Sequence, residues 1–348
     1  MRAILAFFAL ALSPIFPQPT SAAPAELGLA APRAGEEKEF RHPAPKEVFD
    51  IVWVVDGDTV HITYHGKKEK LRLLSVDTEE KGDVGPTKPA TVFGQECALW
   101  ADEFFSSRAK EGEPGRIGLI FPGGKERRDI YGRLLCHVIL EDGTDFNLLL
   151  VQLGKSPYFN KYGNSTICHE QFVAAQKAAQ EAKLGIWNPE TNKPDKEGRE
   201  SASRPYPELL AWWDARAQAI DNFRAKNKKD SSLWVDAEDP EALEAAIKLG
   251  KEVNVFCILD RKEYEEDDGS KTLLMRSGDK SKTLRVKLSK DVRKLHEEKL
   301  SFENMRAEFQ QNYLFVRGKV TQGRRGPELV SKDPAQWSLA GPAPVMPK

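Results

Sequence analysis

Short runs of β-branched and other apolar residues, separated by turn residues, recur through the first half of the chain. Such runs fit a half-buried pleated surface, so the pattern predicts strands at residues 51–55, 61–64, 71–76, 117–121 and 134–140. The first three runs lie at short intervals, which is typical of a small antiparallel barrel.

Helical patterns occupy other parts of the same region. Residues 93–108 carry aromatic and apolar side chains at helical spacing, which predicts an amphipathic helix. A short apolar helix is expected over residues 146–153, and an Ala-rich helix is expected over residues 169–184 and ends at Gly185. The first half is therefore expected to be α+β, mainly β, with five strands, three helices and a small barrel.

The second half of the chain begins after a polar stretch with Pro, Gly and Lys at residues 190–205. A helix is expected over residues 207–226, and a helix-like stretch over residues 290–309 interrupts a further set of strands. Those strands are expected at residues 253–259, 273–275, 283–288, 314–320 and 328–330. Five short strands with one inserted helix predict a second barrel of the OB type.

The N-terminus has the pattern of an export signal. A basic Met1-Arg2 precedes an apolar stretch, and small residues near Ala23 offer a cleavage site, so residues 1–23 are expected to be a signal peptide. A membrane anchor is the alternative, but about 14 apolar residues are too few to span a bilayer comfortably. We expect an exported protein, secreted or periplasmic, without a membrane span in the mature chain.

The domain organisation follows from these patterns. Residues 24–45, rich in Ala, Pro and Glu, are expected to be a disordered spacer. A first barrel domain is expected over residues 46–190, a linker with a helix over residues 191–238, and an OB-like accessory domain over residues 239–340.

The overall charge gives no reason to expect strong binding to a polyanion. The 348 residues carry a formal net charge of −1, and residues 46–190 hold 18 basic against 22 acidic residues, a net charge of −4. Any attraction for nucleic acid must come from local patches, and solvated turns are the alternative for each. The candidates are Lys67, Lys68, Lys70, Arg127 and Arg128.

Four cysteines are scattered along the chain, at Cys97, Cys136, Cys168 and Cys257. They do not form a disulfide framework for a chain of this size, and we expect mostly free, buried thiols. Cys168 with His169 resembles a metal or nucleophile pair. No second Cys or His stands at ligand spacing, so a structural role is favoured.

Charged residues recur in three separated pieces that could act together. Asp58 follows the first strand, Asp77 and Glu80 follow the third, and acidic oxygens are the ligands of hard divalent cations. Arg72, inside an apolar strand, and Arg133, beside a Tyr-Gly turn, could clamp a phosphate. A tight turn is the alternative for Asp56-Gly57, and surface salt bridges are the alternative for the arginines.

The motifs in these pieces resemble those of the staphylococcal nuclease family. They are Asp56-Gly57-Asp58-Thr59, the strand exit from Arg72 to Glu80, Asp129-Ile130-Tyr131-Gly132-Arg133, His169-Glu170-Gln171 and Gly185-Ile186-Trp187. The resemblance covers residues 48–188 and implies a five-strand OB barrel with three helices.

The resemblance also implies roles for individual residues. Asp58, Asp77 and the carbonyl of Thr78 would ligate Ca²⁺, and Glu80 would orient or activate the attacking water. Arg72 and Arg133 would bind the scissile phosphate, while Tyr131 and Tyr162 match tyrosines near the substrate. The implied activity is that of an endonuclease, a phosphodiester hydrolase that cuts DNA and RNA and leaves 3′-phosphates.

Two features keep a second hypothesis open: Glu79 stands where the family commonly has proline, and the matched domain has an acidic charge balance. The loop at residues 158–162 is also one residue longer, which leaves Tyr162 as the match there. A catalytically silent nucleic-acid-binding or scaffold protein with the same fold is therefore the alternative. No protein partner is predicted, and the oligomeric state stays open.

The C-terminal unit has no assigned role from its sequence. It could be a spacer, an oligomer interface or a grip for single strands, because OB barrels bind strands through aromatic and basic residues. The residues to test for a grip are Phe315, Arg317, Arg324 and Arg325.

Overall fold

The computed structural model describes residues 40–82, 88–129, 131–191, 193, 204–277, 282–300, 311–343 and 345. The expected signal peptide and all but the last six residues of the expected spacer over 24–45 lie outside them. Within the described ranges, no helix is long and apolar enough to cross a membrane.

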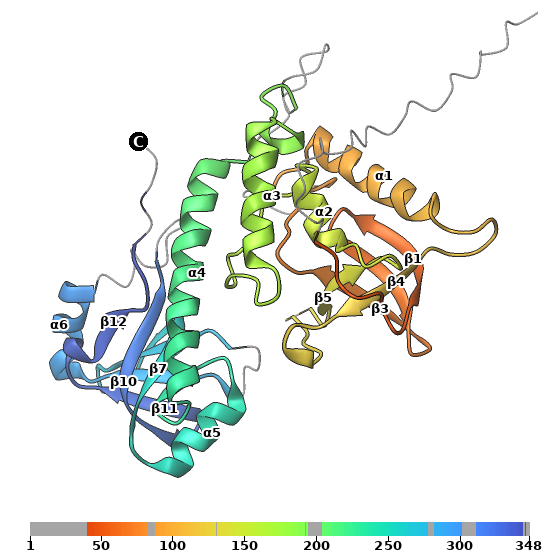
Figure 1. Ribbon diagram of the computed structural model, residues 1–348. Coiled ribbons are helices and arrows are strands. Elements are labelled where there is room, and N and C mark those ends of the chain that lie inside the picture. The colour runs from red at the N-terminus through yellow and green to blue at the C-terminus, as the bar shows by residue number, and fades with distance from the viewer. Residues whose placement is uncertain are drawn as a thin grey trace, which may run out of the picture. The chain divides into compact units, whose positions relative to one another are not determined.

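Five strands of the described chain close into a first barrel, in the order β1-β2-β3-β5-β4 (Figure 1). All neighbours are antiparallel except β3 and β5, which run parallel. In β2, Val60 and Ile62 are buried while Thr63 is exposed, so side chains alternate between the core and the surface. The strands are β1 (Phe49–Asp56), β2 (Thr59–Tyr64), β3 (Lys67–Leu73), β4 (Arg116–Ile120) and β5 (Leu134–Ile139).

Three helices accompany this barrel: α1 (Val92–Ser106), α2 (Phe146–Gln152) and α3 (His169–Glu181). The Thr91 hydroxyl accepts a hydrogen bond from the Gly94 amide at 2.8 Å and so caps the start of α1. Phe104 and Phe105 of α1 meet Phe146 of α2 in the barrel core, with ring centroids 5.2 and 4.5 Å apart. The expected five-strand OB-type barrel with three helices is confirmed.

The third strand ends earlier than expected. It was predicted to continue to residue 76, but β3 stops at Leu73 and Ser75 adopts a left-handed backbone conformation with φ of 64°. A left-handed residue breaks the pleat, so the chain turns out of the sheet before the acidic residues. The segment from Val76 to Glu80 is consequently free to reach other parts of the barrel.

The second half of the described chain repeats the same barrel topology. Strands β7, β8, β9, β11 and β10 pair in that order, and β10 also pairs with β7, which closes the ring. Only β9 and β11 run parallel within this ring, as β3 and β5 do in the first barrel. The elements are α4 (Tyr206–Lys229), β6 (Trp234–Asp236), α5 (Pro240–Leu249), β7 (Glu252–Glu265), β8 (Lys271–Met275), β9 (Arg285–Leu288), α6 (Lys290–Leu300), β10 (Tyr313–Gly323), β11 (Gly326–Ser331) and β12 (Trp337–Leu339).

Three of these elements were not foreseen: β6, α5 and β12. The short strands β6 and β12 extend the sheet beside β7 and β10. The helix-like stretch at residues 290–309 contains α6, which ends at Leu300, and the rest of the stretch lies outside the described residues.

Phe315 cannot serve as an exposed aromatic grip in this structure. Its side chain is buried against Phe256 and Trp234, with ring centroids 5.8 and 5.0 Å away. Arg317 is exposed and forms an ion pair with Glu252 at 3.0 Å. The aromatic part of the proposed grip is therefore wrong for Phe315, which is a core residue.

The four cysteines agree with the expectation from the sequence. Each is buried and none is paired in a disulfide. Burial raises the pKa of Cys97 to about 12, so this thiol is protonated at neutral pH.

Candidate active site

The candidate site forms where the β1–β2 turn meets the exit from β3. Thr59 pairs with Arg72 across β2 and β3, and the Leu73 amide donates to the Asp58 carbonyl at 3.1 Å. The Asp77 amide donates to the Ser156 hydroxyl at 2.8 Å, which fixes the exit segment. Local sheet pairing and one loop contact therefore bring acids from two strands together.

Arg72 joins the two aspartates that were expected to hold a metal ion. One end of its guanidinium forms an ion pair with Asp58, and Nη2 donates to Asp77 Oδ1 at 2.7 Å. Asp58 and Asp77 are 5% and 0% exposed, so these are buried charges. The predicted phosphate clamp thus has one of its arginines, Arg72, paired with acids in this structure.

Lys88 links Asp77 with the third acid. Its Nζ donates to Asp77 Oδ1 at 2.7 Å and to Glu80 Oε1 at 3.2 Å. The Thr78 amide donates to Asp58 Oδ2 at 3.1 Å, so the residue expected to offer a carbonyl also lies in the cluster. Asp58, Asp77, Thr78 and Glu80 are thus connected, with two cationic side chains between the acids.

The pKa values of two acids in this cluster, Asp77 and Asp56, are shifted in opposite directions. Burial alone would raise the pKa of Asp77, but the charges of Lys88, Arg204 and Arg72 hold it well below its usual range. Burial and the nearby charge of Asp58 raise the pKa of Asp56 to about 7.

This donor set fits a hard divalent cation. Such an ion takes carboxylate, carbonyl and water oxygens, and Asp58, Asp77 and the Thr78 carbonyl offer the first two kinds. Direct ligation by both aspartates requires Arg72 to move away, because its guanidinium bridges them.

Two glycines allow the site to close. A Cβ atom on Gly57 would lie 2.7 Å from Thr78 Cγ2, and one on Gly94 would lie 2.2 Å from the Glu80 carbonyl oxygen. Both distances are shorter than real Cβ contacts. The Asp56-Gly57 step is therefore more than a tight turn, because Gly57 also permits the approach of the β3 exit.

Arg133 and Tyr131 form a separate group. Arg133 Nε donates to Asp129 Oδ2 at 2.7 Å, and the guanidinium carbon lies 5.5 Å from the centre of the Tyr131 ring. Tyr131 is 77% exposed. The contacts described for Arg133 therefore join it to its own turn rather than to the acids at the β3 exit.

Tyr162 is half exposed and lies among cations. The Arg276 guanidinium carbon lies 5.6 Å from the centre of its ring, and Lys161 Nζ lies 5.7 Å from it. Burial lowers the pKa of Lys161 to about 8. An aromatic face between positive charges is a suitable environment for a nucleotide.

Residues beyond the first barrel complete the site, and sequence reasoning missed them. Arg204 is buried and donates to Asp77 Oδ2 at 2.6 Å and to the Asp77 carbonyl at 3.2 Å. The Tyr206 hydroxyl donates to Glu79 Oε1 at 2.9 Å. Both precede or begin α4, in a stretch interpreted from sequence as a domain boundary and linker, and no short motif marks them.

Glu79 has a defined place in this arrangement. It is 1% exposed, and its other oxygen accepts a hydrogen bond from the Thr91 hydroxyl at 2.6 Å. Its carboxylate therefore connects the β3 exit with the start of α1 and the start of α4. The departure from the common proline introduces a charge that hydroxyl groups of this chain solvate.

Comparison with known proteins gives a consistent result. The family model described as "Staphylococcal nuclease homologue" matches residues 70–189. The thermonuclease of Staphylococcus intermedius is 32% identical over 143 residues, which cover 40% of this chain and 76% of that protein. The thermonuclease of Staphylococcus hyicus is 30% identical over 150 residues, 42% of this chain and 78% of that protein.

Longer relatives match over the same region. The SPbeta prophage-derived endonuclease YokF of Bacillus subtilis is 32% identical over 145 residues, 41% of this chain and 45% of that protein. Endonuclease YncB of the same organism is 33% identical over 134 residues, 38% of this chain and 58% of that protein. The matched region thus spans about half the length of these two proteins. With the closed five-strand barrel and its cluster of acids, these matches show that the chain belongs to the staphylococcal nuclease family.

Proposed function

We propose that this protein is an exported, Ca²⁺-dependent endonuclease that hydrolyses phosphodiester bonds of DNA and RNA and leaves 3′-phosphate ends. The observation that carries the proposal is the pair of buried carboxylates, Asp58 and Asp77, close enough for one guanidinium to bridge. Relatives named thermonuclease and endonuclease support the same activity.

In this proposal, Asp58, Asp77 and the Thr78 carbonyl hold the ion. When bound, the cation supplies positive charge to the phosphate and a binding position for water. With an ion held by the two aspartates, Arg72 would leave its position between them and its guanidinium would pair with a phosphate oxygen. The bridge seen here therefore represents the resting state of Arg72.

Glu80 is the proposed acceptor for the proton of the attacking water. It needs only hydrogen-bond reach to that water, and its present partner, Lys88, is a side chain that can move aside. Arg133 exchanges its bond to Asp129 for the phosphate, where it stabilises the charge that develops in the transition state. Tyr131 and Tyr162 are proposed to contact the substrate through their exposed rings.

The test is digestion of single- and double-stranded DNA and of RNA by the chain without residues 1–23. Cleavage is expected with Ca²⁺ and is expected to stop with excess chelator. Glu80→Gln and Arg133→Met are expected to lower the cleavage rate by at least 100-fold while circular dichroism stays unchanged. Glu141→Gln and Arg116→Met, which alter an exposed ion pair of the same barrel, are the matched controls.

A folded protein that cuts none of these substrates with Ca²⁺ would overturn the proposal. The silent binding or scaffold hypothesis would then be the better explanation. Equal cleavage by Glu80→Gln and the parent would overturn the assignment of Glu80 alone.

The proposal also assigns a role to each part of the chain. The nuclease part is assigned to residues 46–190, the linker to residues 191–238 and an accessory barrel to residues 239–340. The contacts of Arg204 and Tyr206 with Asp77 and Glu79 indicate that the linker also supports the nuclease site.

A further inference from the structure

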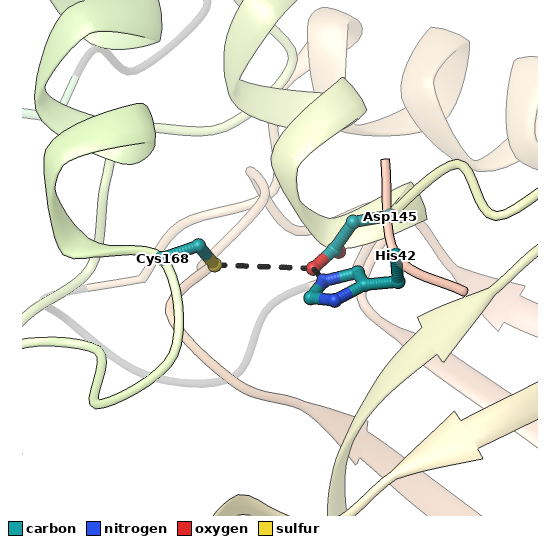
Figure 2. A group of neighbouring side chains, drawn as sticks. All are labelled: His42, Asp145 and Cys168. Carbon is teal, nitrogen blue, oxygen red and sulfur yellow. Dashed lines mark hydrogen bonds and ion pairs between the residues drawn. The ribbon is translucent and has the colours of Figure 1, made fainter. Parts of the chain in front are cut away.

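A second cluster of metal-ligating side chains uses none of the residues of the proposed nuclease site. It contains His42, Asp145 and Cys168 (Figure 2). Across the residues that the structure describes, this is the one group of three or more His, Cys, Asp or Glu whose ligand atoms all lie within 4.8 Å of one another.

The three side chains converge on one carboxylate oxygen. His42 Nε2 lies 3.1 Å from Asp145 Oδ2, and Cys168 Sγ lies 3.9 Å from the same oxygen, as the dashed line to Cys168 in Figure 2 indicates. His137 lies outside that group but contacts the same oxygen, with Nδ1 2.9 Å away. The His42 side chain is 11% exposed, and the other three residues are almost completely buried.

The surrounding structure holds each member in place. The His42 amide donates to the Gly143 carbonyl at 2.9 Å, which fixes the segment before β1. Asp145 uses its other oxygen, Oδ1, to cap α2 through the Leu148 amide at 3.1 Å, so Oδ2 is left for the cluster. Cys168 immediately precedes α3. The cluster is thus built from three separate segments of the chain.

We propose that these residues form a site for Zn²⁺ or a similar transition metal, with His42, Asp145 and Cys168 as ligands, water in the fourth position and His137 holding the Asp145 carboxylate. An imidazole, a carboxylate and a thiolate are ligands that zinc takes in tetrahedral sites. A thiolate and an imidazole do not suit Ca²⁺, which takes oxygen ligands. The site therefore differs in metal class from the proposed nuclease site.

The geometry requires small movements. Metal–ligand bonds of about 2.0–2.3 Å give ligand separations of roughly 3.3–3.8 Å in a tetrahedron. The separations of 3.1 and 3.9 Å at Asp145 Oδ2 lie on either side of this range. The His137 ring keeps its hydrogen bond with Asp145 and so orients this ligand.

Charge also favours this ion. On binding, Cys168 releases its thiol proton to solvent, so a thiolate and the Asp145 carboxylate together carry two negative charges. A divalent cation balances them, and the buried site becomes neutral. Binding would tie the segment before β1 to α2 and α3, and would stabilise the first barrel without taking part in cleavage.

Cobalt substitution tests the proposal without measuring nuclease activity. The full mature chain is stripped with a chelator, titrated with Co²⁺ and then with Zn²⁺, and followed by absorption and metal analysis. We expect one Co²⁺ per chain with a thiolate-to-cobalt charge-transfer band, displaced by one Zn²⁺. Cys168→Ser is expected to abolish the band, whereas Cys257→Ser, at a buried thiol in the second barrel, keeps it.

His42→Gln provides a second variant at the most exposed ligand, where the fold is least at risk. The substitution is expected to weaken Zn²⁺ binding at least 10-fold. The thermal unfolding temperature of the parent is expected to rise on addition of Zn²⁺, whereas that of the variant is not. Absence of a charge-transfer band in the parent, or equal metal binding by the parent and Cys168→Ser, would overturn the proposal. The cluster would then be a hydrogen-bonded network around Asp145.

Discussion

Arg204 offers the sharpest test of how the linker supports the candidate site. It contributes a buried guanidinium to Asp77, which is fully buried, through bonds of 2.6 and 3.2 Å. Replacement by methionine keeps an unbranched apolar side chain and removes both hydrogen bonds. The perturbation therefore isolates the charged contact between the linker and the β3 exit.

The expected loss of stability depends on which ion-pair partners Asp77 retains after the substitution. Removing one partner of a buried ion pair usually costs about 3–5 kcal/mol because a buried charge is left alone. Asp77 retains Arg72 and Lys88, each at 2.7 Å, so its charge stays compensated. Arg204 Nε also has no partner within the described part of the chain, so its burial carries a penalty that the substitution removes. We therefore expect a loss of about 2 kcal/mol, below the usual range.

Hydrogen exchange followed by mass spectrometry localises this effect, because a chain with two barrels need not unfold in one step. A loss of about 2 kcal/mol corresponds to roughly 30-fold faster exchange of amides around residues 76–80 if they exchange through opening of this contact. Arg317→Met is the control, since the Arg317–Glu252 pair is exposed and is expected to contribute about 1 kcal/mol or less. If the amides of residues 76–80 exchange at the same rate in the Arg204→Met and Arg317→Met variants, Arg204 does not stabilise the site.

Three further predictions concern single residues. Burial, and then the charges of Glu238 and Asp239, raise the pKa of Asp236 to about 6, so the folded state loses stability as the pH rises from about 4 to 6. Asp236→Asn should raise the free energy of unfolding by about 1–3 kcal/mol at pH 7.5, and this gain should disappear near pH 4. Equal gains at both pH values in thermal unfolding would contradict the reasoning. Gly94→Ala should lower both stability and cleavage because its Cβ meets the Glu80 carbonyl, whereas Gly82→Ala, which meets nothing within 4 Å, should not. Glu79→Pro should destabilise the chain by about 1–3 kcal/mol in thermal unfolding because the Tyr206 hydroxyl loses its acceptor, and adding Tyr206→Phe should recover part of the loss.

Much of the first barrel and its acids could be predicted from the sequence. The sequence grouped Asp58, Asp77 and Arg72 in one site. The short β1–β2 turn and the β3 exit belong to adjacent strands, so local pairing brings Asp58 and Asp77 together. The early end of β3 was missed because the left-handed Ser75 has no signature in an apolar run. Hydrophobic periodicity reports burial and does not report such local reversals.

Contacts between segments far apart in the sequence could not be predicted. Arg204 lies 127 residues from Asp77, and His42 lies 103 residues from Asp145, so no spacing rule could pair them. The helix α5 was missed although its signals are present. Asp239 caps it, Pro240 begins it and Gly250 ends it in a left-handed conformation. The helix α5 could therefore have been predicted from its local signals, whereas the contacts of Arg204 and His42 become visible only in the folded structure.

The two barrels show that strand topology alone does not create the proposed site. In the first barrel, the turn between the first two strands carries the buried Asp58, and a left-handed residue after the third strand leads to Asp77. In the second barrel, the corresponding connection carries Asp268, which bonds to its own turn and to Lys287, while α6 begins directly after β9. Arg293 joins Glu265 and Glu297 there, but these acids are 68% and 39% exposed, unlike the buried Asp58 and Asp77. We therefore expect cleavage to depend on the first barrel alone. Asp77→Asn in the full chain is therefore expected to remove all Ca²⁺-dependent cleavage, and residual cleavage that still needs Ca²⁺ would show that a second site exists.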